Sequence, residues 1–281
     1  MSRPRPAVTA ARLALLVAGA ALFLSPFLWM LLVSLQPSGT SLFEVNPWSP
    51  RQWLARPLEW GNYRRALSTQ PFGLYAWNTC VVTFLGIMGE IVSSSLVAYG
   101  FARFRFAGRR VLFLLVLATM MLPAQVTMVP MFILFRTFGW LDTLKPLIVP
   151  AFFGTAFSIF LFRQYFMTLP RALDEAALID GATRLDILRR IIMPLSKPVI
   201  ATVAVFSFLA RWNDFMGPLI YLSSQRKFTL SLGLASFQGE YSTDWNLMMA
   251  SSLVVMAPCL ALFFAAQRHF VSGIVMTGLR E

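Results

Sequence analysis

The stretch WNTCVVTFLGIMGEIVSSSLVAYGFA, residues Trp77–Ala102, decides the fold class of this chain. Most of its side chains are apolar, and Glu90 is the one carboxylate among them. A helix that crosses a bilayer needs about 20 mostly apolar residues, and this stretch is long enough. We therefore predict that residues 77–102 form a transmembrane helix.

Five further stretches have the same character and lie at roughly Leu13–Leu35, Val111–Phe135, Leu147–Phe166, Val199–Leu222 and Leu247–Ala266. The composition of the 281 residues agrees, because 57% are hydrophobic and only 13% are charged, where soluble domains carry about 25% charged residues. The first stretch is too long for a secretory signal and is expected to be an uncleaved anchor. The sequence thus predicts an all-α polytopic membrane protein with six transmembrane helices.

The orientation follows from the 24 Lys and Arg residues, most of which fall in the connections on one side. Basic residues collect on the cytoplasmic side of membrane proteins, so both termini are predicted to be cytoplasmic. The same rule explains the net charge of +12 as contact with anionic membrane lipid, and no nucleic-acid partner is expected.

The residues that carry covalent or metal chemistry are scarce. Cys80 and Cys259 lie inside apolar runs, and His269 is the only histidine, so we expect no metal site and no enzyme activity. No GxxxxGK[ST] phosphate loop occurs either, and any energy from nucleotide must then come from another polypeptide.

The longest charged interruption in the second half is EAALIDGATRLDILRRIIMP, Glu175–Pro194. Pro170 is suited to start a helix, and Asp174 with Glu175 would sit in its first turn, where the helix dipole favours anions. Gly181 can end that helix in a left-handed conformation. The first half of this loop is therefore predicted to be a short helix followed by a glycine turn.

The second half of the loop begins with a capping signal. Thr183 is a suitable N-cap, and Asp186 stands three residues later in the place of a capping-box acid. Small or apolar residues share one face of the first helix: Ala172, Ala176 and Ile179. An apolar stripe is expected on the second helix: Leu185, Leu188 and Ile192. The residues alone leave two readings open, a surface that docks a protein and an amphipathic loop lying on the bilayer.

The segment EAALIDGATRLDILRRIIMPLSKP closely resembles the EAA loop of type I ABC importer permeases. The matching positions are Glu175, Ala176, Ala177, Ile179, Asp180, Gly181, Ala182, Ile191 and Pro194. Leu188 departs from the pattern, because the family often carries an aromatic residue there. WNDFMGPLIYL at 212–222 and QRHFVSGIVMTGLRE at 267–281 are similar to the carbohydrate subgroup, and the resemblance to its maltose-type second permease covers essentially the whole chain.

This resemblance implies the type I importer transmembrane fold, with residues 1–281 as one permease domain, 73–268 as its core and 167–198 as a cytoplasmic coupling loop. The implied docking residues for an ATPase are Glu175, Ala176, Ala177, Ile179, Asp180, Gly181 and Ala182. ATP and Mg²⁺ would bind the partner ATPase, and this chain would hold no cofactor of its own.

The implied partners are a second permease subunit, two ABC ATPase subunits or domains, and an extracytoplasmic solute-binding protein. The implied function is uptake of a sugar or related polar solute across a bacterial cytoplasmic membrane. Glycerol phosphate importers resemble sugar importers at these motifs, so that substrate class stays open as the alternative.

Polar and ionisable residues inside a span often mark a transport pathway. The candidates are Glu90, Arg211, Asn213 and Asp214. Arg211 and Asp214 are three residues apart and can meet on one helix face, either as a neutralised pair or as part of a gate. An ion-gradient transporter that uses Glu90 or Asp214 is the rival from another class. Gly86, Gly89 and Ser93 favour close helix packing.

Two further local features are predicted. Pro123 and Pro130 should bend the third span, because proline removes a backbone donor and clashes with the preceding turn. The segment GNYRRAL, residues 61–67, is expected to form a short interfacial helix.

Overall fold

A computed structural model of the chain describes residues 6–37, 58–238 and 243–275. The regular elements in these ranges are helices, which confirms the all-α fold class. One isolated β-bridge in these ranges pairs Gln238 with Thr243. The chain divides into two compact units, residues 1–72 with 233–258 and residues 73–232 with 259–281. Each unit is described separately below, and the single permease domain implied by the family resemblance stays a prediction.

The first unit contains α1 (Pro6–Ser34), α3 (Gly61–Thr69) and the first part of α15 (Trp245–Val275). Two asparagines hold the end of α1. The buried Asn62 amide donates to the carbonyls of Ser34 and Gln36, each at 2.8 Å, and Asn246 donates to that of Pro37 at 2.6 Å. The segment GNYRRAL is helical, as predicted, and forms most of α3.

The second unit begins with α4 (Phe72–Arg103), α5 (Arg109–Thr119), α6 (Ala124–Thr137), α7 (Lys145–Ile148), the 3₁₀-helix η1 (Val149–Phe153) and α8 (Ala156–Thr168). It continues with α9 (Ala172–Ile179), α10 (Arg184–Ile187), the π-helix η2 (Leu188–Ile192), α11 (Met193–Leu195), α12 (Lys197–Trp212), α13 (Met216–Tyr221) and η3 (Gln225–Lys227). The remaining helix, α14 (Leu230–Ala235), crosses the boundary between the units.

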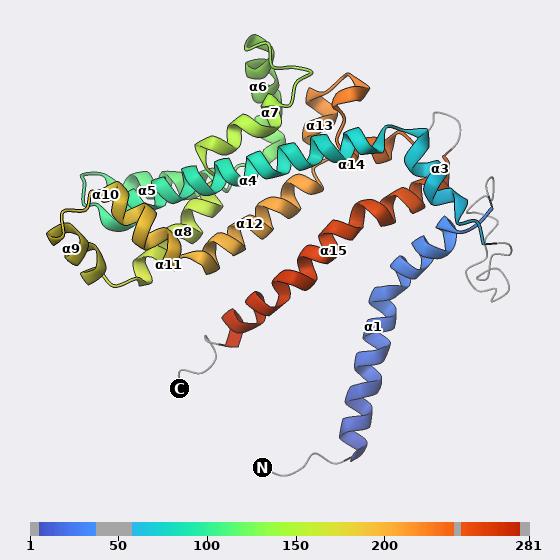
Figure 1. The fold of residues 1–281 in the computed structure, drawn as a ribbon, viewed down its shortest axis with the longest axis horizontal. Helices are drawn as coiled ribbons and strands as arrows, with labels where there is room; N and C mark the ends of the chain where they lie inside the picture. The colour runs from blue at the N-terminus through green and yellow to red at the C-terminus, as the bar shows by residue number, and fades with distance from the viewer. Residues whose placement is uncertain (1–5, 38–57, 239–242, 276–281) are drawn as a thin grey trace. The chain divides into compact units, whose positions relative to one another are not determined.

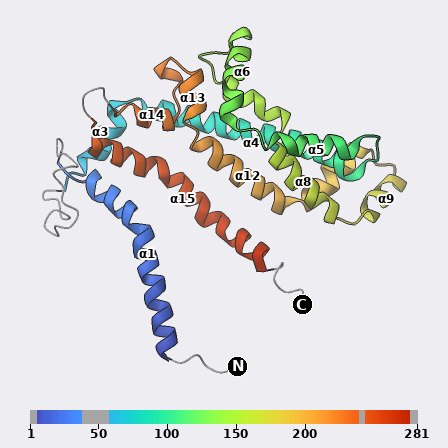
Figure 2. The ribbon, with the colours of Figure 1, turned by 180° about the vertical axis from the view of Figure 1, so that it is seen from behind.

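Helix α8 packs between α5 and α12 in the second unit (Figure 1). The short helices α9 and α10 lie at the same end of this unit as the connection from α4 to α5, which the view from behind also shows (Figure 2). The core at this end is formed by residues from α4, α8 and the α9–α11 region, including Phe101, Phe162, Phe166, Ile187 and Ile192. Burial of these apolar side chains fixes the short helices against the long ones.

Four stretches each qualify on their own as candidate membrane spans: Arg12–Ser34, Phe72–Arg103, Lys145–Thr168 and Trp245–Ala265. Two further pairs qualify only as bent spans, namely Arg109–Thr119 with Ala124–Thr137 at 95° and Arg184–Leu195 with Lys197–Trp212 at 80°. All six predicted stretches therefore lie on apolar helices of the described chain, but three are interrupted.

The third predicted span, 111–135, is two helices and not one bent helix. The chain leaves α5 at Met120, and Pro123 adopts an extended conformation with ψ of 137° immediately before α6. Proline disfavours a helical conformation in the residue before it and cannot donate to the preceding turn, so the break falls here. Pro130 lies inside α6, which continues past it.

The fourth and fifth predicted spans are also interrupted. Within 147–166 the chain passes through η1 and turns at Gly154, which has a φ of +78°, before α8 begins. Within 199–222 helix α12 ends at Trp212 and α13 starts at Met216. Local capping explains the second break, because Asn213 donates to the Leu209 carbonyl at 2.8 Å and Asp214 accepts from the Gly217 N–H at 3.0 Å.

Candidate functional site

The loop between α8 and α12 has the predicted helix–turn–helix form. Helix α9 ends at Ile179, and Gly181 follows with a φ of +81°, in the left-handed region that only glycine adopts without strain. Thr183 caps α10 by accepting from the Asp186 N–H at 3.2 Å, and the Asp186 carboxylate accepts from the Thr183 N–H at 3.2 Å. This capping box confirms the local prediction.

The predicted apolar stripe of α10 is wrong at one position. Leu188 and Ile192 are buried in the core, but Leu185 is 62% exposed and Ile187 is buried in its place. The π-helix η2 follows directly, with a hydrogen bond from the Met193 N–H to the Leu188 carbonyl five residues earlier. Ile187 and Ile192 are five residues apart, the spacing of a π turn, and both are buried in the core.

Helix α9 has an inner and an outer face. Asp174 and Ala177 are buried on the inner face. The outer face is formed by Ala172, Ala176 and Ile179, which are all exposed, and Ile179 reaches 87% exposure. The loop therefore presents small and apolar groups outward without a covering element in the described part of the chain.

A buried ion pair ties α9 to the end of α4. The Arg103 Nε lies 2.9 Å from the Asp174 carboxylate, and their side chains are only 3% and 8% exposed. Arg103 also donates from Nη2 to the Leu169 carbonyl at 3.1 Å. Arg103 is the last residue of α4, so this pair fixes the position of the loop relative to that helix.

A second buried carboxylate lies midway along α4. Glu90 accepts three hydroxyl hydrogen bonds of 2.7 Å, from Thr155 and Ser158 through Oε1 and from Ser207 through Oε2. The Arg211 Nη2 donates to the same Oε2 at 3.0 Å. The four donors belong to α8 with its N-cap and to α12, so Glu90 joins these two helices to α4.

Arg211 fits beside Glu90 because α4 carries a glycine there. A Cβ on Gly86 would lie 2.5 Å from the Arg211 Nε, and the guanidinium also reaches the Leu147 carbonyl at 3.4 Å. The sequence allowed Arg211 to pair with Asp214, but in the structure Arg211 forms its ion pair with Glu90. Asp214 lies beyond the end of α12, where it caps α13.

The small residues of α4 allow the close packing that the sequence predicted. A Cβ on Gly89 would lie 2.6 Å from the Phe152 ring, so this glycine admits the ring. Ser93 donates to the Gly89 carbonyl at 2.7 Å and to the Ala151 carbonyl at 3.1 Å. Helix α4 thus approaches η1 closely at these positions.

Residues 90–275 match the family described as the binding-protein-dependent transport system inner membrane component. The chain belongs to this family. It is the permease subunit of an ABC importer and is embedded in a membrane through its apolar helices.

Three relatives show how far the similarity extends. The permease is 32% identical to the arabinooligosaccharides transport system permease protein AraQ of Bacillus subtilis, over 92% of this chain and 91% of that protein. It is 35% identical to the trehalose/maltose transport system permease protein MalG of Thermococcus litoralis, over 95% and 96%. It is 36% identical to the sn-glycerol-3-phosphate transport system permease protein UgpE of Pectobacterium atrosepticum, over 77% and 79%.

A solved structure agrees with the fold of the permease. A chain from the crystal structure of a bacterial ABC transporter involved in the import of the acidic polysaccharide alginate superposes with a TM-score of 0.82. The two chains are 25% identical, and the match covers 96% of the permease and 99% of that chain.

The predicted docking residues of the permease do not share one environment. Glu175, Ala176, Ile179, Asp180 and Gly181 are exposed. Ala182 is half-buried, and Ala177 is buried within the core beneath the loop. Ala177 can therefore position the loop but does not lie on its outer surface.

Sequence reasoning missed the partners of the two buried pairs. Nothing in the sequence near Arg103 indicates that it pairs with Asp174. Likewise, nothing near Ser207 indicates that it bonds to Glu90. One clue was available for Asp174, which is three residues before Ala177 and so shares its inward face. No comparable clue existed for the donors to Glu90, which come from segments at least 65 residues away.

A third carboxylate links two connections of the permease outside the candidate spans. Asp142 has a φ of +54° and accepts from the Ser223 and Ser224 N–H groups at 3.1 and 2.8 Å, while Lys227 lies 3.3 Å away. Hydrogen bonds from the Ser224 hydroxyl and from these N–H groups hold the pKa of the Asp142 carboxyl below its ordinary value. This contact joins the segment before α7 to the one after α13.

Proposed function

We propose that this permease carries a carbohydrate or a related polar solute inward across a bacterial cytoplasmic membrane. The named substrates of its relatives AraQ and MalG support a sugar. The similarity to UgpE favours a phosphorylated polyol as the second candidate. In this proposal the permease works with a second permease subunit, two ABC ATPase subunits or domains and an extracytoplasmic binding protein.

The observation that carries the mechanical part of the proposal is the exposed outer face of α9. Ala172 and Ala176 allow another backbone to approach closely, and Ile179 offers an apolar anchor that is 87% exposed. An exposed apolar group among small residues is typical of a protein interface. We infer that an ATPase subunit docks on this face, and that this ATPase, not the present chain, binds ATP with Mg²⁺ and hydrolyses the ATP.

The rigid attachment of the loop supports force transfer. The pair of Arg103 with Asp174 and the core around Ala177 prevent α9 from moving independently of α4. A displacement of the docked ATPase would therefore reach α4 directly. Coupling between two sites needs a physical connection that carries displacement from one to the other, and this attachment supplies it.

The predicted pathway residues receive separate roles in this proposal. Glu90 with Arg211 clamps α4, α8 and α12 together and must rearrange if these helices separate. Asn213 and Asp214 lie at the break between α12 and α13, where irregular backbone within an apolar span needs polar partners. These residues are candidates for the wall of the transport pathway.

The decisive experiment measures ATP hydrolysis by the complex reconstituted in vesicles, stimulated by the substrate-loaded binding protein. Gly181→Pro is expected to reduce stimulation to the basal rate, because proline cannot adopt a φ of +81°. Glu175→Lys is expected to do the same by reversing an exposed charge on the docking loop.

Asp244→Lys is the matched control for Glu175→Lys, since it reverses an exposed acid away from the loop. Membrane insertion is followed in parallel for every variant. If both loop variants insert and keep full stimulation, the proposed role of the loop is wrong. Titration of the binding protein with maltose, arabino-oligosaccharides and glycerol 3-phosphate distinguishes the two substrate classes.

A further inference from the structure

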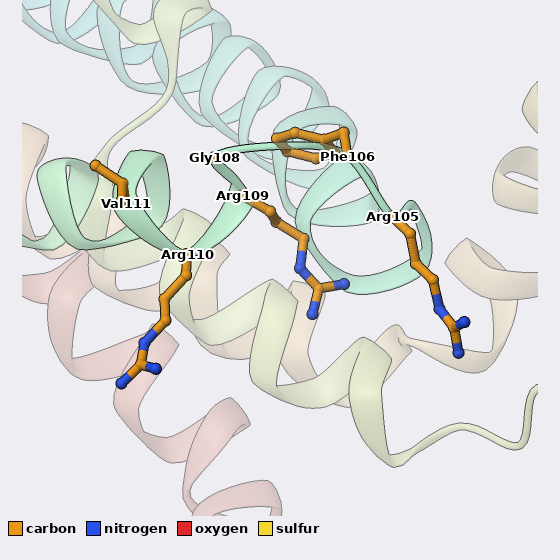
Figure 3. A pocket seen from close by; sticks show the side chains of 6 residues that line it. All are labelled: Arg105, Phe106, Gly108, Arg109, Arg110 and Val111. Atoms are coloured by element: carbon orange, nitrogen blue, oxygen red, sulfur yellow. The ribbon is translucent and has the colours of Figure 1, made fainter.

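An open recess lies at the connection between α4 and α5, beside the coupling loop. It has a volume of about 510 Å³ and is lined by Arg105, Phe106, Gly108, Arg109, Arg110 and Val111. This volume falls within the range of ~300–1,000 Å³ that small-molecule sites occupy. Figure 3 shows the three arginine side chains on one side of the connection and the Phe106 ring on the other.

The positive charge of this recess is not neutralised within the described part of the chain. The ion pairs in the described part of the chain do not include Arg105, Arg109 or Arg110. The side chain of Arg109 donates a hydrogen bond to the neutral Phe104 carbonyl at 3.0 Å. A fourth arginine, Arg163 of α8, is an electrostatic neighbour of Arg109 and stacks over Phe113 at 4.1 Å. Neighbouring like charges repel, and an anion between them offsets that repulsion.

The start of α5 adds to the attraction for an anion. Gly108 precedes the helix with a φ of +77°, and α5 extends for 11 residues from Arg109. The first N–H groups of a helix lack intrahelical acceptors and carry the positive end of the dipole. The recess therefore combines guanidinium donors with the positive end of a helix dipole.

An apolar surface continues from the recess along α5. Val111 is 61% exposed, Leu114 is 55% exposed and Leu115 is 58% exposed. These residues belong to a candidate membrane span, so hydrocarbon is their natural surrounding. A charged recess at the end of an apolar helix face matches a molecule with an anionic head and a hydrocarbon tail.

We propose that this recess binds the phosphodiester headgroup of an anionic phospholipid, with the acyl chains along Val111, Leu114 and Leu115. The inference rests on the membrane embedding of the permease and not on its substrate. Arg103, which holds the coupling loop, directly precedes this connection, and Arg184 of the loop lies over Phe104 at 5.8 Å. Bound lipid would therefore contact the base of the coupling loop.

The test uses the purified full-length permease in detergent and counts retained lipid by native mass spectrometry. Phosphatidylglycerol, phosphatidylcholine and inorganic phosphate are titrated separately. The permease is expected to retain phosphatidylglycerol in preference to phosphatidylcholine. The triple variant Arg105→Gln, Arg109→Gln, Arg110→Gln should lose this preference, at about fivefold in affinity for each arginine near a lipid surface.

The matched control removes the same charge elsewhere, through Arg64→Gln, Arg136→Gln and Arg226→Gln, all exposed arginines outside the recess. This control should keep the preference. A charge-preserving set of Arg→Lys changes at the recess provides a second variant if the glutamine variant does not fold, and it should retain most of the binding.

Three results would overturn the proposal. Equal retention of phosphatidylglycerol by both glutamine variants would show that the recess is not the site. Displacement of the lipid by millimolar inorganic phosphate would assign the recess to a free anion. Loss of the preference in the control variant as well as in the recess variant would show that it follows total charge and not this recess. None of these depends on transport activity, so the proposed function is tested separately.

Discussion

At the scale of single residues, Glu90 is the best-defined polar feature of the membrane helices. A carboxylate buried in an apolar span needs compensation, because transfer of an unpaired charge out of water is very unfavourable. Glu90 has this compensation in three hydroxyl donors and one guanidinium. The residue is therefore stable as a structural clamp between α4, α8 and α12.

The first prediction concerns this pair. Glu90→Gln should destabilise the permease by about 3–5 kcal/mol, because it leaves Arg211 buried without a counter-charge. Arg211→Gln should act in the same direction by leaving Glu90 unpaired. The double variant should be less damaged than the sum of the two single variants. The melting temperature of the detergent-solubilised protein is measured for the two single variants and the double variant. If the loss of stability in the double variant equals the sum of the two single losses, the two residues do not interact.

The second prediction uses two glycines of α4. Gly86→Ala should lower the melting temperature and weaken the Glu90–Arg211 pair, because the new Cβ would lie 2.5 Å from the Arg211 Nε. Gly100→Ala is the matched control, since nothing lies within 4 Å of a Cβ there. Alanine is favoured over glycine by up to about 1 kcal/mol inside a helix, so the control should be neutral or stabilising. Equal melting temperatures for both variants would refute the close contact.

At the scale of elements, the coupling loop depends on local signals for its shape and on one distant residue for its position. The capping box of Thr183 with Asp186 and the turn at Gly181 define the two helices. Arg103 then fixes α9 against α4 through Asp174. In the proposed function this second contact holds the loop so that its exposed face can transmit a displacement to α4.

The third prediction tests that contact. Arg103→Met and Asp174→Asn should each uncouple ATP hydrolysis from stimulation by the loaded binding protein, while the protein still inserts. The exchanged pair, Arg103→Asp with Asp174→Arg, should recover part of the stimulation, because the charges again attract in a buried site.

Recovery by the exchanged pair separates positioning from a general loss of stability, and melting temperatures are compared with stimulation for each variant. If the single variants keep normal stimulation although both are stably folded, the ion pair does not carry force to α4.

At the scale of the whole molecule, the chain is a membrane-embedded subunit of a larger importer, and its relatives include sugar permeases. In the proposed function, the outer face of α9 is the docking surface and the energy comes from ATP on another subunit.

The fourth prediction concerns this energy source. Right-side-out vesicles that contain the complex should accumulate solute when ATP is supplied inside, on the ATPase side, and a proton gradient without ATP should give no uptake. Glu90→Gln is included because an ion-gradient transporter would use a carboxylate of this kind. Uptake that follows the proton gradient in the parent protein and disappears in Glu90→Gln would support the rival mechanism.

The sequence by itself determined the features that depend on neighbours in the chain. Hydropathy located the six apolar stretches, and the signals at Gly181, Thr183 and Asp186 located both helices of the coupling loop. Each of these depends on side chains within one or two helical turns or on the apolar length that a bilayer requires.

Only the tertiary structure decided which distant groups meet. Glu90 and Arg211 are 121 residues apart, and the sequence equally allowed Arg211 to meet Asp214. The break at Gly154, the inward direction of Ala177 and the pair of Arg103 with Asp174 also appear only when the helices pack. The physical reason is that buried polar groups bond to whichever partner the packed helices bring within hydrogen-bonding distance. The sequence of one segment does not indicate which distant segment will pack against it.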